Sequence, residues 1–236
     1  MNDGHLLVAY HGCDITTRDA LVAGRTALKA SDNDYDWLGP GVYFFEGDAE
    51  RAAAFAQSAH DNPAKRFTAK PIATPAVVGA VLCAQRSLDM TTRAGLQEFE
   101  SAYPALQLVW EANDVPEGKR PVNVQPAHPS DDVIVRKLDN AVFRMIHETR
   151  AFRGQPAFQI VRGAFRQGPE LAPHSGLHRD SHVQIAVQDM ACVVGWFLRP
   201  GDRILTGNQA QLAQQRFDTA AKEYPKTKSR VRLVAK

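Results

Sequence analysis

Runs of residues typical of β-strands gather near the two ends of this chain, and helix-like segments occupy most of the middle. Continuous apolar character, or alternation of apolar and polar residues, marks each run. The runs lie at 6–10, 41–45, 76–84, 157–164, 182–187 and 192–198. Strands that alternate regularly with helices would favour a parallel sheet, whereas grouped strands favour an α+β fold. We therefore expect an α+β protein.

Helices are predicted where a polar side chain that can accept a bond from the first backbone N–H groups precedes a helical pattern. The first three predicted helices are 18–23 after Thr16 or Thr17, 49–59 after Asp48, and one from Thr91 or Thr92 to Tyr103. A fourth follows Ser130, with Asp131 and Asp132 in its first turn, and a fifth runs from Asn208 to Tyr224. Turn-forming residues predict loops at 30–40, 114–129 and 167–180.

Length and composition are those of an ordinary globular protein. The chain has 236 residues, of which 44% are hydrophobic and 23% charged. It lacks the long apolar run of a transmembrane helix and the features of a signal peptide, so we expect it to stay in the cytoplasm unless a secretion system exports it. We expect one domain over 1–236, with a helical and loop insertion around 85–155 and a helix plus basic tail at 207–236.

Three cysteines are present, and no two form a CxxC pair. Cys13, Cys83 and Cys192 lie within or beside apolar runs, which indicates packing residues in a reducing compartment. Cys13 borders the segment discussed next and is the candidate for a reactive exception. His174, His178 and His182 are close in sequence but lie in a loop without an obvious fourth ligand, so we expect no metal.

Two features suggest that a flat, electron-poor ring binds near the N-terminus. His11 and Gly12 end the first strand, and a glycine there lets a flat group approach the backbone. Tyr43 follows the rigid turn 39–41, and an aromatic face can stack on such a ring. We expect the rings of His11 and Tyr43 to face each other across a slot for a dinucleotide.

The order of these motifs resembles the ADP-ribosyltransferase superfamily. The segment YHG, followed by WLGPGVYF and an alanine-rich helix, looks like its diphtheria-toxin and poly(ADP-ribose)-polymerase branch, which carries a His-Tyr-Glu triad. The run VRGAF and later HVQIAV is also similar to uncharacterised bacterial ADP-ribosyltransferase-like proteins. The likeness covers 6–56 and 158–197, and 62–157 resembles no family that we can name.

The resemblance implies a split antiparallel sheet with flanking helices and a site for NAD as substrate. By that resemblance, His11 binds the adenosine ribose, Gly12 holds the nicotinamide amide through its backbone, and Tyr43 stacks on nicotinamide. Gln184 stands where the family has its glutamate. A carboxylate there stabilises the positive charge that develops as nicotinamide leaves, and a glutamine provides a hydrogen bond without the charge.

Three alternatives follow from the glutamine. Either Gln184 itself supports transfer, or an acid such as Glu170 or Asp180 enters from the loop, or the protein binds NAD without reacting it. Ser31, Asn33 and Arg51 are further candidates for binding ribose or phosphate, although turn or surface roles are also open. The acceptor-binding candidates, on or beside the loop before Gln184, are Arg162, Gln167, Glu170, Arg179 and His182.

The function implied is an NAD-dependent mono-ADP-ribosyltransferase, plausibly a bacterial toxin or defence effector with an antitoxin as a possible partner. The acceptor is expected to be a macromolecule. Local positive charge favours RNA or DNA over protein, although the net charge is only +2. The cations concerned are Arg162, Arg166, Arg179, Lys226, Lys228, Arg230, Arg232 and Lys236. The alternatives are an NAD glycohydrolase and a non-catalytic module that binds NAD or nucleic acid.

Overall fold

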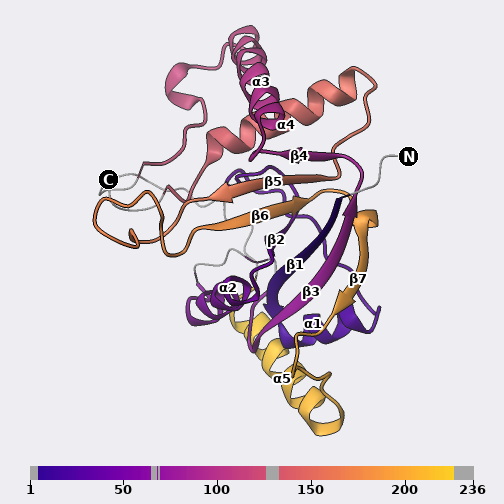
Figure 1. Ribbon diagram of the computed structural model, residues 1–236. Coiled ribbons are helices and arrows are strands. Elements are labelled where there is room, and N and C mark those ends of the chain that lie inside the picture. The colour runs from indigo at the N-terminus through magenta and orange to yellow at the C-terminus, as the bar shows by residue number, and fades with distance from the viewer. Residues whose placement is uncertain (1–4, 65–67, 69, 126–132, 226–236) are drawn as a thin grey trace.

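A seven-stranded sheet lies at the centre of the computed structural model, which describes residues 5–64, 68, 70–125 and 133–225 (Figure 1). The strands are β1 (His5–Asp14), β2 (Val42–Glu46), β3 (Pro75–Ala84), β4 (Ser87–Asp89), β5 (Ile160–Phe165), β6 (His182–Val187) and β7 (Val193–Phe197). Their order across the sheet is β4-β5-β6-β2-β1-β3-β7. Each neighbouring pair is antiparallel except β4 and β5.

The helices of the described residues are α1 (Ile15–Val22), α2 (Ala49–Asp61), α3 (Arg93–Ala112), α4 (Lys137–Phe152) and α5 (Gly207–Glu223), with short 3-10 turns η1 (Glu117–Lys119) and η2 (Met190–Cys192). Helices α3 and α4 lie together over one end of the sheet, and α1, α2 and α5 lie near the other (Figure 1). Helices and strands thus combine in one mixed sheet structure, which confirms the α+β class.

The two faces of the sheet have different covers. On the face that we call the helical face, Phe45 and Val77 pack with Ala52 of α2, and Val161 packs with Phe143 of α4. The opposite face, which we call the α1 face, carries the fully buried ring of Phe44. There α1 packs through Leu21 on Cys13 and Val78. Alternation of side chains along each strand therefore decides which predicted site residues can meet.

Several helix starts follow their local sequence. Asp48 caps α2 by accepting a bond from the backbone N of Arg51 at 2.8 Å, as predicted. Thr92 caps α3 through the backbone N of Gly95 at 3.1 Å. The first helix differs, because Asp14 accepts from the backbone N of Thr16 at 2.9 Å and α1 begins at Ile15, before either predicted threonine cap.

Helix α3 was predicted to end near Tyr103 but continues through Pro104 to Ala112. Proline removes one helical hydrogen bond. Apolar side chains on both sides of it, such as Ala102 and Leu106, bury against α4, and this packing favours continuing the helix. The short edge strand β4 was not predicted, because three residues are too few to show a period.

Helix α4 begins at Lys137, later than predicted. A distant residue supplies its cap: Asn123 Oδ1 accepts from the backbone N of Leu138 at 3.1 Å and of Asp139 at 3.3 Å. Ile134 precedes the helix and is exposed. The proposed cap Ser130, with Asp131 and Asp132, lies outside the described residues, as does the basic tail from Lys226 onward.

Candidate functional site

The three strands that carry the predicted motif are neighbours at the centre of the sheet. His11 lies on β1, Tyr43 on β2 and Gln184 on β6, and the sheet order is β6-β2-β1. Phe45 of β2 pairs with Gln184 on one side and with Tyr10 on the other. Segments from opposite ends of the chain therefore meet within three adjacent strands.

Strands β1 and β2 part immediately beyond this point. They pair only at Ala9↔Glu46 and Tyr10↔Phe45, whereas β1 pairs with β3 along its whole length from His5 to Asp14. His11 and Gly12 therefore lie within β1 and not at its end, contrary to the prediction. The His11 ring enters the gap and its Nδ1 lies 2.8 Å from the Tyr43 carbonyl oxygen. In a continued ladder that carbonyl would accept from the Gly12 N–H. The imidazole therefore takes a backbone acceptor that would otherwise hold the strands together.

Gly12 directs its backbone polar groups into this gap. The Val8 carbonyl accepts from the Gly47 N–H on the β2 side at 2.9 Å. Alternate residues of an antiparallel strand point their N–H and C=O to the same side, so those of Gly12 also point towards β2. No β1–β2 pair is formed at Gly12. The gap therefore contains a backbone donor and acceptor from one residue, which is the pattern that binds a carboxamide.

A second reason for glycine at this position is its close contact with α2. A Cβ built on Gly12 would clash with the backbone carbonyl of Ala52 and lie 3.2 Å from the Ala56 side chain. The helical face above Gly12 is therefore filled by α2. Gly12 is buried, and α2 closes the approach to it from above the sheet.

His11 is partly buried, and its hydrogen bond fixes its tautomer. Burial lowers the pKa of His11, although the bond to the Tyr43 carbonyl opposes this shift. The carbonyl accepts, so Nδ1 carries the proton and the neutral ring keeps Nε2 as an acceptor. An acceptor at that position suits a ribose hydroxyl.

The rings of His11 and Tyr43 do not face each other as predicted. Register places His11 with Ala9 on the α1 face, and Tyr43 with Phe45 on the helical face. Tyr43 Oη donates to the Gly39 carbonyl at 2.8 Å and accepts from the Leu38 N–H at 3.0 Å. Burial raises the pKa of Tyr43 well above its usual value. In this structure the partly buried ring packs against the cluster that contains Leu38 and Phe143, and its hydroxyl supports the 30–40 loop.

The structure brings four other predicted residues into one hydrogen-bonded group on the helical face. Gln184 Nε2 lies 2.8 Å from His182 Nε2, and Arg51 Nε lies 3.3 Å from His182 Nδ1. Arg51 also donates to Gln167 Oε1, and its guanidinium lies over the Phe45 ring with 5.7 Å to the centroid. This group joins α2, the start of the β5–β6 loop and β6.

Two further residues complete this group and had no sequence signal that linked them to Gln184. Trp37 Nε1 donates to Gln184 Oε1 at 2.7 Å. Arg136 stacks on Trp37 and on Phe165, at 4.8 and 4.1 Å from the ring centroids. Nothing in the sequence connects Trp37 with Gln184, which lies 147 residues further along the chain. The resulting surroundings are cationic and aromatic.

Ser31 and Asn33 brace the loop before β2. Ser31 pairs with Gly41 in an isolated bridge, and its Oγ donates to the Gly41 carbonyl at 3.0 Å. The Asn33 N–H donates to Asp36 Oδ2 at 2.8 Å, and its carbonyl accepts from Asn140 of α4. These contacts correspond to the turn role that the sequence left open.

Arg162 does not join the acceptor-binding group, contrary to the prediction. Its strand position pairs with Ile185, which places it on the α1 face, opposite Gln184. There it forms ion pairs with Glu46 at 2.5 Å and with Asp89 at 3.1 Å, and donates to Thr91 Oγ1 at 2.8 Å. Its guanidinium is occupied in tying β2 to the β4–β5 edge.

The β5–β6 loop holds the two acids considered as substitutes for a catalytic glutamate (Figure 1, left). Glu170 pairs with His178 in an isolated bridge and accepts from the backbone N of His174 at 2.9 Å. The Asp180 carboxylate lies so close to Gly168 that a Cβ there would clash with it. Neither acid contacts Gln184 in this structure. Arg179 lies exposed on the same loop.

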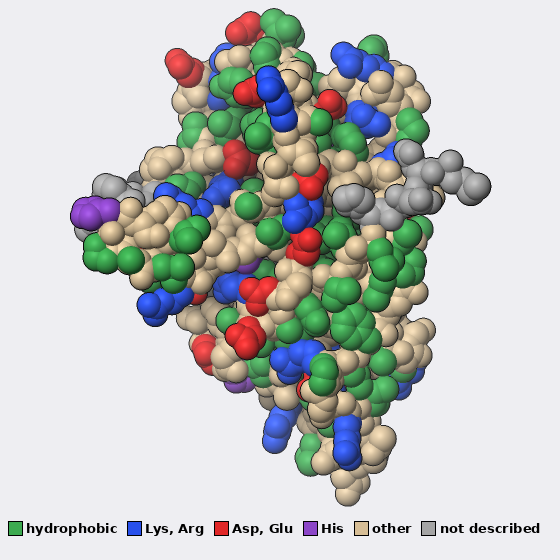
Figure 2. Space-filling model, in the orientation of Figure 1, with side chains coloured by type: hydrophobic (Ala, Val, Ile, Leu, Met, Phe, Trp, Pro, Cys, Tyr) green, Lys and Arg blue, Asp and Glu red, His purple; other side chains and the backbone are tan. Residues whose placement is uncertain are grey.

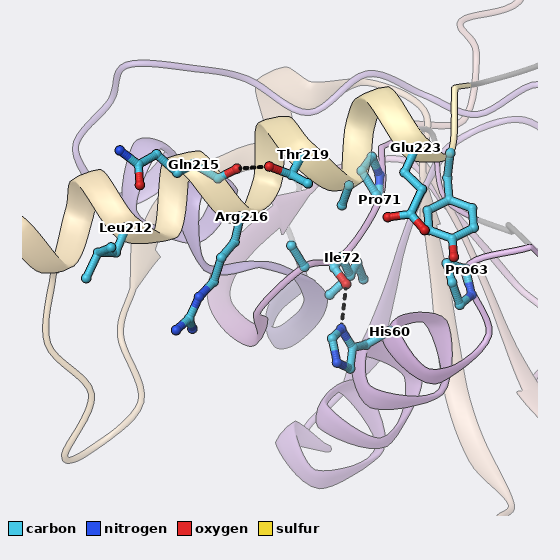
Figure 3. A pocket seen from close by; sticks show the side chains of 12 residues that line it. His60, Pro63, Pro71, Ile72, Leu212, Gln215, Arg216, Thr219 and Glu223 are labelled. Atoms are coloured by element: carbon cyan, nitrogen blue, oxygen red, sulfur yellow. Dashed lines mark hydrogen bonds between the residues drawn. The ribbon is translucent and has the colours of Figure 1, made fainter.

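Two hollows in the described part of the chain lie away from these residues. One of about 440 Å³ lies between the end of α2, the segment 71–73 and α5, where His60 Nδ1 bonds the Ile72 carbonyl (Figure 3). Another of about 350 Å³ lies beside α2 and β3 and reaches Arg199. Their linings contain none of the predicted site residues. The candidate site residues therefore form two groups on neighbouring strands, His11 on the α1 face at the β1–β2 gap and the Gln184 group on the helical face.

Within the described ranges, no cluster of His, Cys, Asp and Glu side chains has the arrangement of a metal site. Cys13, Cys83 and Cys192 are free thiols, and burial raises the pKa of Cys13 to about 12. Among the same residues no helix is both long and apolar enough to cross a membrane. Comparison with known proteins found no match among family models, curated proteins or solved structures.

Proposed function

We propose that this protein is an NAD-dependent mono-ADP-ribosyltransferase whose catalytic site uses Gln184 where related enzymes use glutamate. The observation that carries the proposal is the parting of β1 and β2 at His11 and Gly12. There a backbone donor–acceptor pair faces a gap beside the strand that bears Gln184. This arrangement supports the roles that the sequence resemblance implies for His11 and Gly12.

In the proposed reaction the C1′–N bond of the nicotinamide ribose breaks, and nicotinamide leaves with the bonding electron pair. The acceptor nucleophile forms the new bond to C1′ and releases its proton to solvent or a nearby base. Gly12 holds the carboxamide, His11 Nε2 accepts from an adenosine ribose hydroxyl, and Gln184 bonds the nicotinamide ribose; because His11 and Gln184 lie on opposite faces of the sheet, NAD has to pass between β1 and β2 to meet both. Arg51 balances phosphate charge. Positioning contributes more here than charge stabilisation, because Gln184 is neutral.

The acceptor is proposed to be a macromolecule, and nucleic acid is favoured over protein. Arg166 and Arg179 are exposed at the β5–β6 loop, and an exposed pair of arginines can contact phosphates. Arg162 is not one of the cations available to phosphates, because Glu46 and Asp89 neutralise its charge. Figure 2 shows Lys and Arg side chains interleaved with Asp and Glu on the face it presents, so any basic surface is local. Action as a toxin or defence effector in the cytoplasm fits such an activity.

One observation favours a second candidate, a non-catalytic module that binds NAD or nucleic acid. The hydrogen-bond partners of Gln184 among the described residues are Trp37 and His182, and neither supplies negative charge. Without a carboxylate, stabilisation of an oxocarbenium-like transition state is weaker.

The test is to incubate the purified chain with labelled NAD and to measure bound NAD, released nicotinamide and label on added RNA, DNA or protein. Transfer predicts nicotinamide release that depends on acceptor and incorporates label. Gln184→Ala should lower transfer by about 10²-fold or more. Gln188→Ala, on the residue that follows β6, should not. Release of nicotinamide without an acceptor would instead identify a glycohydrolase. Binding of NAD without release of nicotinamide would identify the non-catalytic module. Absence of NAD binding would exclude every NAD-dependent function.

A further inference from the structure

Gln184 is held from both sides by side chains with opposite hydrogen-bonding requirements. The indole of Trp37 can only donate, and its Nε1 lies 2.7 Å from Gln184 Oε1. The Gln184 amide nitrogen must then face the other way, where it lies 2.8 Å from His182 Nε2. The orientation of the amide is therefore determined by the tryptophan.

The tautomer of His182 follows from the amide. Because the Gln184 NH₂ group donates, His182 Nε2 must accept, and the ring proton is on Nδ1. The Asp180 carbonyl, 2.7 Å from Nδ1, accepts that proton. Arg51 Nε, 3.3 Å from the same Nδ1, is placed to donate to it and so favours the opposite tautomer. The Asp180 carbonyl and the amide orientation that Trp37 imposes together decide for the proton on Nδ1. Burial and this arginine also lower the pKa of His182, which agrees with a neutral ring.

We propose that Trp37 is the positioning residue of this site: its indole orients the Gln184 amide and, through it, sets the tautomer of His182. The catalytic part of this inference rests on the proposed function, whereas the tautomer does not. In the orientation that Trp37 imposes, Gln184 keeps one N–H and one oxygen lone pair for a ligand. A ribose hydroxyl can use both, donating to the oxygen and accepting from the N–H.

The same geometry explains why a glutamine suits this position. A glutamate could accept from Trp37 with one oxygen, but its second oxygen would face the lone pair on His182 Nε2. That contact becomes favourable only if Nε2 carries a proton, which the ring obtains either by taking up a second proton or by giving up the Nδ1–H bond to the Asp180 carbonyl. The His182 and Gln184 side chains thus form a matched neutral pair. Gln184→Glu should therefore raise the pKa of His182, and an unchanged or lowered value would contradict the pairing.

Proton-detected nitrogen spectra of the histidine rings provide the direct test. The wild-type chain should show His182 protonated on Nδ1. Trp37→Phe removes the indole donor while keeping an aromatic ring, and should give a mixture of tautomers. Trp110→Phe, on α3 away from Gln184, is the matched control and should leave His182 unchanged. A wild-type ring protonated on Nε2, or a tautomer unaffected by Trp37→Phe, would overturn the proposal.

A second variant disturbs Trp37 without altering any hydrogen-bonding group. Gly163 of β5 lies under the indole, and a Cβ there would be 2.7 Å from Trp37 Cη2. Gly163→Ala should therefore shift the indole and produce the same His182 signature as Trp37→Phe. Gly163→Ala keeps the tryptophan but moves it. If both variants show the same change in the His182 tautomer, the cause is the disturbed Trp37–Gln184 hydrogen bond.

Kinetics then tests the catalytic part. Trp37→Phe should lower kcat for NAD-dependent transfer by about 10²-fold while the Kd for NAD changes little, since misorientation of one group affects the reacting geometry most. An unchanged kcat would contradict the positioning role. If wild-type protein transfers no ADP-ribose, the proposed function fails, but the tautomer measurement still stands or falls on its own.

Discussion

His11, His147 and His182 are kept neutral by their surroundings. Burial lowers the pKa of each, and for His147 the value falls to about 4. The His147 ring lies against Phe158, its Nε2 is 2.8 Å from Gln188 Nε2, and Arg150 adds a nearby positive charge. Protonating any of these rings places a positive charge in a buried setting, and for His147 and His182 an arginine lies nearby.

Stability should consequently fall in mild acid. A folded-state pKa below the reference value of 6.5 means that the unfolded chain binds protons more readily. The stability that these neutral histidines contribute is complete above pH 6.5 and is lost as the pH falls towards 4. His147 accounts for about 3 kcal/mol of it at most. Urea unfolding at pH 7 and at pH 4.5 should show the loss, and His147→Gln should reduce the difference. His174→Gln, in the exposed loop, should not; an equal effect of both would contradict the assignment to His147.

The sequence could predict which strands carry the candidate residues but not the contacts that those residues make. His11, Gly12 and Gln184 were found from motif order, and the structure places their strands side by side. The Trp37–Gln184 bond and the Arg51–His182 contact join distant segments, so no local pattern records them. The opposite orientation of the His11 and Tyr43 rings follows from strand register, which a motif alone does not specify.

Strand β5 connects the β4 edge of the sheet with its centre through Arg162. This guanidinium joins Glu46 of β2 and Asp89 of β4, and all three side chains are only 20–22% exposed. Removing the cation leaves two partly buried carboxylates close together. The residue therefore stabilises the arrangement of β2, β4 and β5.

Arg162→Leu should lower the free energy of unfolding by about 2 to 3 kcal/mol, because each carboxylate loses its charged partner. Urea denaturation at pH 7 measures this. Arg166→Leu, on an exposed arginine just after the same strand, is the control and should change stability by less than about 0.5 kcal/mol. If both variants unfold at the same urea concentration, Arg162 is not part of the structural framework and a binding role is again open.

Prediction of elements succeeded where the pattern was local and failed where distant residues decide. Strand β3 (Pro75–Ala84) was predicted from its continuous apolar run, and α2 from its Asp48 cap. The start of α4 depends on Asn123, and the continuation of α3 past Pro104 depends on packing against α4. These are tertiary contributions that a single segment cannot show.

Across the whole molecule, two groups of helices cover different parts of the sheet, and side chains from several elements meet over its central strands. Helix α2 covers β1 and β3 on the helical face, α3 and α4 cover β4, β5 and β6, and Arg51, Gln184 and Trp37 meet between these two groups. The gap between β1 and β2 opens beside this region. The grouping of strands at the two chain ends predicted the fold class, whereas the separation of the helix covers emerges only in three dimensions.

The central claim is that NAD binds at the β1–β2 gap with its carboxamide on Gly12. A titration of isotope-labelled protein with NAD tests it, following the Gly12 backbone amide and the His11 and His182 rings by NMR. We expect all three signals to shift along one saturable curve, while His60, beside the hollow at α5, stays unchanged. If Gly12 and His11 do not respond at NAD concentrations that saturate any other site, NAD does not bind in the gap and the proposed function is wrong.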